Sequence, residues 1–248
     1  MAASHALSPM LPDASADAPA AVVPIPEVRE YPRINAEAVR HLDAGHARVV
    51  LAGAAGHRLL LQGLSGPWNA TVEVEGYAGP ELAAELNAPG LMVVCRGPVG
   101  DGAARDLRAG RLLILGNAGD ALAYSQRGGA VLVAGSSGHR AGLGLAGGSL
   151  VLLGDVGRLA GERQSGGLLW AVDGRLGPHA RRGQRGGRFV RFIPDGDDNS
   201  GMEPGDAEAL SSLMRGFAPW LGSYGAEAGL PFSVHPHFPP DPLTSPPS

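Results

Sequence analysis

Four copies of one glycine motif decide the fold of this chain: Gly97-Pro98-Val99-Gly100, Gly116-Asn117-Ala118-Gly119, Gly135-Ser136-Ser137-Gly138 and Gly154-Asp155-Val156-Gly157. Each copy begins 19 residues after the previous one, as the numbers 97, 116, 135 and 154 show. Glycines at positions 110, 129, 148 and 167 repeat at the same step. Three glycine columns that share one period indicate a repeat protein.

Apolar residues lie two and four positions before the first glycine of each copy. This alternation, rich in β-branched residues, predicts a short strand with one buried face. Because glycine adopts positive φ without steric cost, we expect the glycines to form the corner after each strand. The predicted inward pairs are Val93 and Cys95, Leu112 and Ile114, Val131 and Val133, and Leu150 and Leu152.

The motif continues on both sides of the regular stretch with a less regular step. Upstream it recurs at residues 53–56 and 76–79, and downstream at 174–177, where Trp170 and Val172 stand at the predicted strand positions. Extra residues at corners are the usual way in which a solenoid accommodates insertions. The predicted structural corners are Gly97, Gly100, Gly116, Gly119, Gly135, Gly138, Gly154, Gly157, Gly174 and Gly177.

A unit of 19 residues is too short for a pair of helices of ordinary length. It fits a parallel β-helix, whose coils stack about 4.8 Å apart and pair as parallel strands do. Leucine-rich repeats have a similar period, but their asparagine ladder is missing from this sequence. We therefore expect an all-β fold, a single-stranded right-handed parallel β-helix of about seven coils that ends near Phe192.

The segment before the repeats is predicted to hold a tail and a capping helix. Residues 1–30 lack a basic start and a continuous apolar stretch, so we expect a disordered tail and no signal peptide. Asn35 is a candidate N-cap for a helix over 35–44, and Gly45 would end that helix. The helix would cover the first coil of a β-helix domain predicted over 31–194, because an open coil exposes unpaired backbone groups.

The chain after the repeats is predicted to form a C-terminal extension over 195–248. Within it, residues 206–221 have apolar side chains near helical spacing and predict one amphipathic helix. This helix would close the last coil or lie along the tube. Residues 231–248 hold seven prolines and predict an extended arm.

Composition sets outer bounds on function. With 39 glycines and only 5% aromatic residues among 248, the core must be built from aliphatic side chains. The net charge of −4 gives no reason to expect a nucleic acid or an anionic membrane as partner. Cys95 is the single cysteine and is predicted to be buried, so no disulfide and no cysteine-based iron–sulfur or zinc site forms within one chain. No apolar run approaches the ~20 residues of a membrane-spanning helix, and we expect a cytoplasmic protein.

Three local patterns could suggest chemistry, and each has a structural explanation. The G-x-G-x-x-G pattern at 142–147 is followed by a strand, not by the helix that dinucleotide binding requires. Ser136 and Ser137 occupy the middle of a corner and lack the G-x-S-x-G context of a hydrolase. His235 and His237 stand in the proline-rich arm, where a chance pair is more common than a metal site. We expect no catalytic, cofactor-binding or metal-binding residue in this chain.

Two features predict a contact surface for another protein. Several strand residues that should face outward are apolar, and a sizeable exposed apolar patch marks an interface. We expect the C-terminal helix to cover part of this patch, and another subunit or a second copy of the chain to cover the rest. A cluster of arginines forms either a solvated rim of the last coil, neutralised by Asp195, Asp197 and Asp198, or a docking patch for an acidic partner. The residues are Leu113, Leu115, Leu132, Val151 and Leu153 in the patch and Arg181, Arg182, Arg185, Arg188 and Arg191 in the cluster.

The repeats resemble the GXGXG domain, the β-helix that ends the large subunit of glutamate synthase. Stand-alone versions of this domain are subunits of archaeal-type glutamate synthases and N-methylglutamate synthases. The resemblance covers about residues 34–192. It includes Ile34-Asn35-Ala36-Glu37 at the start of a helix, then Gly45-His46, and His57-Arg58 before a leucine run.

The resemblance implies a non-catalytic structural or assembly subunit of an enzyme that transfers the amide nitrogen of glutamine to an oxo-acid. It implies glutaminase and synthase parts as protein partners, with FMN and iron–sulfur clusters on those partners. The β-helical subunit of formylmethanofuran dehydrogenase and its counterpart in the formyltransferase/hydrolase complex use the same repeat, and residues 177–183 are similar to that group. The long N-terminal region of that group is not seen in this sequence, which favours the glutamate synthase side. An independent enzyme stays a third hypothesis, because a site assembled across coils leaves no local signature.

Overall fold

The computed structural model describes residues 19–25, 30–172, 174–193 and 200–221. Nine strands and three helices follow one another in this part of the chain. The strands are β1 (Ala21–Pro24), β2 (Arg48–His57), β3 (Ala70–Ala78), β4 (Asn87–Cys95), β5 (Ala109–Ile114), β6 (Arg127–Val133), β7 (Gly147–Leu152), β8 (Ser165–Val172) and β9 (Gly186–Phe192). The helices are α1 (Tyr31–Asp43), α2 (Asp206–Arg215) and α3 (Ala218–Leu221).

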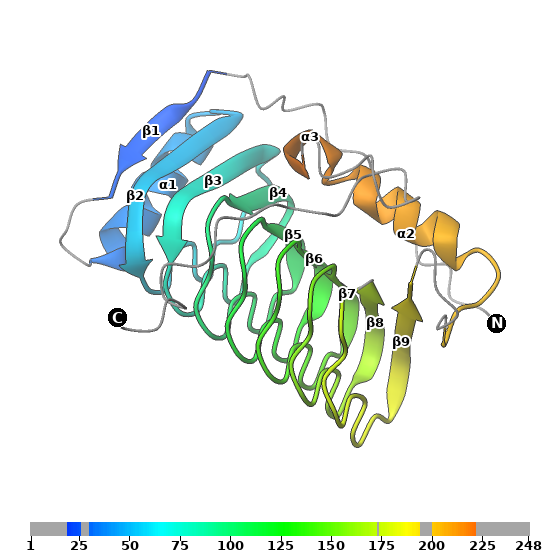
Figure 1. Cartoon of the computed structure of the whole chain (residues 1–248). Coiled ribbons are helices and arrows are strands. Elements are labelled where there is room, and N and C mark those ends of the chain that lie inside the picture. Colours follow the sequence, from blue (N-terminus) through cyan, green and yellow to red (C-terminus); the bar gives the residue numbers. More distant parts are fainter. Residues whose placement is uncertain (1–18, 26–29, 173, 194–199, 222–248) are drawn as a thin grey trace, which may run out of the picture.

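Each strand pairs in parallel with the next, so that one sheet runs in the order β1 to β9. Figure 1 shows the strands stacked along one axis, with irregular loops returning on the opposite side of the column. Each coil from β2 onward therefore consists of one strand and one returning loop. The chain is a parallel β-solenoid of about seven turns, which confirms the fold predicted from the glycine period.

The interior consists of stacked aliphatic side chains. Val93 pairs in register with Leu112, and Leu112 with Val131, and all three are fully buried. The predicted strand positions are wrong for β8, where Leu169 and not Trp170 pairs with Leu150. The extra residue in this coil lies between the strand and Gly174, so counting back from the glycine selects the wrong face.

The corner glycines are required for a reason different from the predicted one. The ten predicted corner glycines do not have a positive φ. An added Cβ would lie 2.3 Å from the carbonyl oxygen of Gly76 at Gly97, and 2.6 Å from that of Gly135 at Gly154. The backbones of successive coils thus stack too closely for any side chain. In the third column, by contrast, Gly129 has a φ of +64° and does use the left-handed conformation.

The returning loops form a second hydrogen-bonded ladder, which we call the turn face. In each of seven coils, three alternate residues have a positive φ, such as Ala121, Ala123 and Ser125. The first and third of these residues donate their N–H groups to the next coil, and the second donates to the previous coil. Ala121 N donates to His139 O at 2.8 Å, and Ala123 N to Ala103 O at 2.8 Å. Hydrogen bonding in both directions offsets the about 1–2 kcal/mol that an L-residue loses in this conformation.

The N-terminal end is closed more extensively than the sequence predicts. Strand β1 lies within the predicted disordered tail and pairs with β2, so the prediction for 1–30 is wrong at these residues. Helix α1 begins four residues before the predicted start, with a proline in its first turn. Asn35 is therefore buried inside α1 and is not its N-cap. The end of α1 is predicted correctly, because Gly45 adopts a φ of +84° directly after it.

The C-terminal extension covers the outer sheet face of the solenoid. The predicted single helix over 206–221 is divided into α2 and α3, which are separated by Gly216 and Phe217. Figure 1 shows both helices running along the outside of the strands. Phe217 is fully buried between the helices and the sheet, which explains why the chain bends there.

Candidate functional site

The apolar outer face is occupied by the chain itself. The five leucine and valine residues of the predicted patch are at most 7% exposed and form one cluster with α2 and α3. Trp170 belongs to the same cluster, together with Met214, Phe217 and Trp220. The predicted cover by the C-terminal helical segment is confirmed, and the described residues leave at most 7% of each of these side chains exposed, so little of the patch remains for another subunit. The five patch residues are Leu113, Leu115, Leu132, Val151 and Leu153.

An ion-pair network marks the edge of this covered face near β3. Glu73 is fully buried, and its carboxylate accepts hydrogen bonds from Arg48 and from Arg96, the latter at 2.8 Å. The Arg96 guanidinium also lies 5.9 Å from the ring centre of Trp220. The two arginines compensate the charge of the buried carboxylate. The network links β2, β3 and α3, so its role is to stabilise their packing.

The predicted arginine cluster divides into two groups. Arg188 donates to Asp206 at 2.9 Å and to Gly201 O at 3.1 Å, so it fastens the last strand to the start of α2. Arg191 is 8% exposed and pairs in register with Ala171, so it lies in the inward column of the solenoid and not in the contact with α2. Arg181, Arg182 and Arg185 are exposed on the last coil, and within the described residues they form no ion pair.

The last coil carries backbone donors that earlier coils use for stacking. Leu159 N donates to Pro178 O at 3.0 Å, and Arg163 N to Arg182 O at 2.8 Å. His179 and Gly183 occupy the same positions one coil later. Their N–H groups bond to nothing in the described part of the chain, because no eighth coil follows there. We call residues 176–185 the open end.

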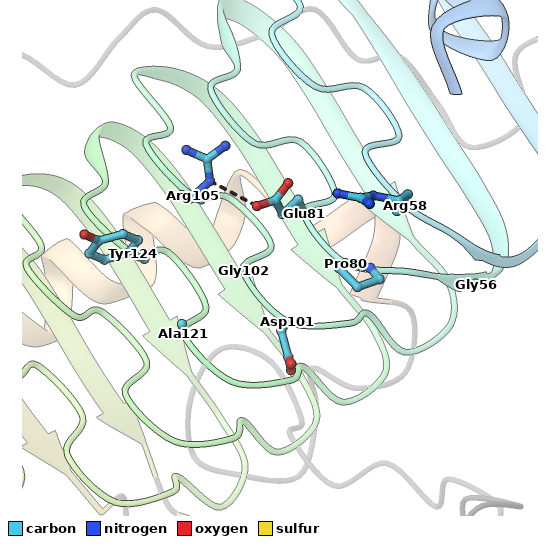
Figure 2. Close-up of a pocket in the computed structure, with 9 residues that line it drawn as sticks. All are labelled: Gly56, Arg58, Pro80, Glu81, Asp101, Gly102, Arg105, Ala121 and Tyr124. Atoms are coloured by element: carbon cyan, nitrogen blue, oxygen red, sulfur yellow. Dashed lines mark ion pairs between the residues drawn. The ribbon is translucent and has the colours of Figure 1, made fainter. Parts of the chain in front are cut away.

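A shallow pocket of about 620 Å³ lies on the turn face of the first coils. Figure 2 shows Glu81 and Arg105 paired across two coils, with Arg58 beside them and Tyr124 on the opposite side. Arg105 also donates to Glu85 at 3.0 Å, so these carboxylates are held by one guanidinium. The pocket is an open depression between stacked loops, and Tyr124 at its rim is 40% exposed.

Polar corner side chains form a ladder that sequence reasoning did not find. Asp101 accepts a hydrogen bond from Asp120 N at 2.8 Å, and Asp120 accepts one from His139 N at 2.7 Å. His139 continues the ladder to Arg158 N at 3.2 Å. These residues share the 19-residue period, and that shared period is the signal that could have found them.

The local patterns with possible chemistry have structural surroundings. Gly142 and Gly144 of the G-x-G-x-x-G pattern lie in the left-handed turn ladder and lead into β7. Burial raises the pKa of the Cys95 thiol to about 11, against the smaller lowering effect of two backbone hydrogen bonds. His235 and His237 lie outside the described residues. In the part of the chain that the structure describes, no group of three or more His, Cys, Asp or Glu could hold a metal ion.

Comparison with known proteins adds no assignment. The sequence matches no protein-family model, and no curated protein matches it significantly. Among the described residues, none of the helices has the length and apolar character needed to cross a membrane.

Proposed function

We propose that this chain is the non-catalytic structural subunit of a glutamate-synthase-type flavoenzyme. The observation that carries the proposal is the set of corner glycines, which repeat every 19 residues over positions 97–157 and stack directly on one another, as at Gly97 and Gly116. The same glycine repeat underlies the resemblance to the GXGXG domain. In this proposal the chain joins a glutaminase part to a synthase part of the enzyme.

The architecture suits the task of holding two partners at a fixed distance. Eight steps of about 4.8 Å between nine strands make a column about 38 Å long. Hydrogen bonds link the coils both through the sheet and through the turn face, so the column resists bending along its axis. Solenoid proteins commonly use the long surface of such a column to bind partners. A partner bound at one coil would therefore keep its separation from a partner bound at another.

In this proposal the redox chemistry belongs to the partners. The flavin and the iron–sulfur clusters reside on the synthase subunit, and the amide nitrogen of glutamine is released on the glutaminase subunit. This chain contributes distance and orientation between the two sites. Its buried, poorly acidic Cys95 serves the core and is not expected to bind a cluster.

The test is affinity purification of the tagged full chain from its native cell at its normal expression level. We expect stoichiometric recovery of a flavin-bearing protein, flavin absorption, and glutamine-dependent amination of an oxo-acid by the purified complex. Untagged cells provide the control. Recovery of the chain alone would overturn the proposal. A metallohydrolase-like or molybdenum- or tungsten-containing partner would favour the formylmethanofuran dehydrogenase type of complex.

A further inference from the structure

At the open end, backbone groups of the last coil have no stacked neighbour among the described residues. In the coil before it, Val156 N donates to Arg175 O at 2.8 Å, as part of a series that repeats in every coil. Leu176, His179 and Gly183 hold the corresponding donors in the last coil, and none of these N–H groups is bonded within the described residues. The open end thus presents a ready template for one more rung of backbone.

The sheet side of the last coil is partly covered by the residues that follow β9. On the sheet side, Arg191 N donates to Ser200 O at 2.9 Å. The residues around Gly201 then approach the backbone of Phe189 closely, because a Cβ at Gly201 would lie 2.6 Å from Phe189 O. The described residues therefore bond to the edge of β9 at Arg191 and leave residues 176–185 uncovered.

The charge around the open end indicates the chemistry of the occupant. Five arginines of the last two coils are exposed and form no ion pair with any described residue. The nearby acids are already used, since Asp155 pairs with Arg175 at 2.6 Å and Glu162 with Arg140 at 3.4 Å. An acidic segment would neutralise these charges. The five are Arg158, Arg163, Arg181, Arg182 and Arg185.

The other occupants fit this charge less well. A second copy stacked with its open end against this one would bring two arginine-rich coils together, and like charges in contact are repulsive. In a head-to-tail stack the open end would meet the first coil, whose backbone groups are already bonded to β1 and to Asn35. The net charge of −4 disfavours association with a nucleic acid. An acidic polypeptide in an extended conformation satisfies both the guanidinium groups and the backbone donors.

We infer that the open end binds an extended acidic segment of a partner protein, whose carbonyl groups accept hydrogen bonds from the N–H groups of His179 and Gly183. Its carboxylates pair with Arg182 and Arg185. The segment adds an eighth rung to the turn face, in the manner of strand addition at a sheet edge. This inference deepens the proposed function, because it names one partner contact and rests on that function for the existence of a partner.

The test uses the purified full chain and a fluorescein-labelled synthetic peptide of alternating glutamate and valine as the probe. The variant is Arg182→Glu with Arg185→Glu, and the matched control is Arg58→Glu with Arg108→Glu, two exposed arginines that form no ion pair within the described residues. We expect the first variant to bind the peptide about tenfold more weakly and the control to bind it as the wild type does. A lysine–valine peptide should not bind.

Hydrogen exchange separates rung formation from general charge attraction. With the glutamate–valine peptide bound, the amides of His179 and Gly183 should exchange at least about tenfold more slowly, while amides near Arg58 stay unchanged. Unchanged exchange at the open end, or equal loss of binding in both variants, would overturn the inference. Tighter binding of an oligonucleotide would overturn it as well. So would peptide binding that requires replacement of Asp195, Asp197 and Asp198 by asparagine, because the site would then belong to the chain's own acidic segment.

The outcomes for the two proposals can be told apart. If the native purification recovers a flavin-bearing partner that the Arg182→Glu, Arg185→Glu chain also retains, the inference fails and the proposed function stands. If the peptide binds at the open end and native purification recovers a different acidic partner, the proposed function fails and the inference stands.

Discussion

The two ends of the solenoid differ in how the backbone groups of the terminal coil are hydrogen-bonded. At the N-terminal end, the Leu61 N–H points toward a coil that does not exist, and the side chain of Asn35 takes its place. Asn35 Oδ1 accepts from Leu61 N at 2.7 Å, and Asn35 Nδ2 donates to Leu59 O at 3.0 Å. One side-chain amide thus substitutes for a missing peptide group. At the C-terminal end, His179 and Gly183 have no such substitute among the described residues.

This difference shows that the fold can satisfy the backbone groups of a terminal coil with its own residues, as it does at the N-terminal end. Strand β1 and helix α1 complete the first coil, and Figure 1 shows them stacked against β2. At the other end, α2 and α3 cover the outer sheet face and leave the turn side uncovered. Within the described residues no helix covers the C-terminal end, and exposed arginines lie there instead, which favours the inferred contact with a partner.

The largest expected effect tests whether the open end is loosely packed. Gly174→Ala would place a Cβ 2.0 Å from Gly154 O and 2.2 Å from its carbonyl carbon, whereas at Gly53 the nearest atom is 3.6 Å away. Each corner glycine of the stacked coils meets the coil before it, so the last coil has no more room than the interior. We expect Gly174→Ala to lower the free energy of unfolding by roughly 4 kcal/mol or more, above ordinary overpacking.

The matched control for this prediction is Gly53→Ala in the first coil. Its backbone φ of +90° is unfavourable for alanine, so a loss of about 1–2 kcal/mol is expected from conformation alone. Urea unfolding followed by far-ultraviolet circular dichroism measures both losses. Equal losses in the two variants would show that stacking distance does not govern the glycine columns.

A smaller effect is expected from opening the closed end. Asn35→Leu keeps the buried volume and removes both hydrogen bonds, so Leu61 N and Leu59 O lose their partner. Unsatisfied buried groups cost about 1–3 kcal/mol each, and partial access of water reduces the sum. We expect a loss of about 2–3 kcal/mol and faster hydrogen exchange at Leu61. Asn87→Leu is the control, because Asn87 is exposed, and a similar loss there would refute the capping role.

The sequence predicted the repeating part of the fold because the causes of that part are local. Alternating apolar residues such as Val131 and Val133 set the inward face of each strand, and the glycine period sets the coil length. The prediction failed where a residue acts through a distant one. Asn35 is a residue type that is common at N-caps, so the sequence alone suggested that role. Its actual partner is the N–H of Leu61, which lies 26 residues away and is brought next to it only by the fold.

The hydrogen-bonded ladder of the turn face could not be predicted from the sequence for a related reason. Residues such as Leu159 and Arg140 adopt a positive φ because this conformation lets their N–H groups bond to the next coil, although their own preferences oppose it. A partial signal existed, since Gly142 and Gly161 stand in the same column as Ala104 and Ala123. The coverage of the outer face could not be predicted either, because a 19-residue period says nothing about where a C-terminal helix docks.

The smallest expected effect concerns the contact that fastens α2 to the last coil. Hydrogen bonds from the Arg188 guanidinium, more than its charge alone, lower the pKa of the Asp206 carboxyl below its usual range. Since this pKa is lower in the folded chain than in the unfolded chain, the carboxylate stabilises the fold above about pH 4. That stabilisation is lost as the pH falls from about 4 through the folded pKa.

Asp206→Asn should therefore lower the free energy of unfolding by about 1 kcal/mol at pH 7, a modest value because Arg188 is partly exposed. The difference from the wild type should shrink toward zero as the pH falls from about 4 through the folded pKa of Asp206. Urea titrations at several pH values measure it, with Glu208→Gln as the exposed control. A difference that does not change with pH would mean that Asp206 contributes through packing.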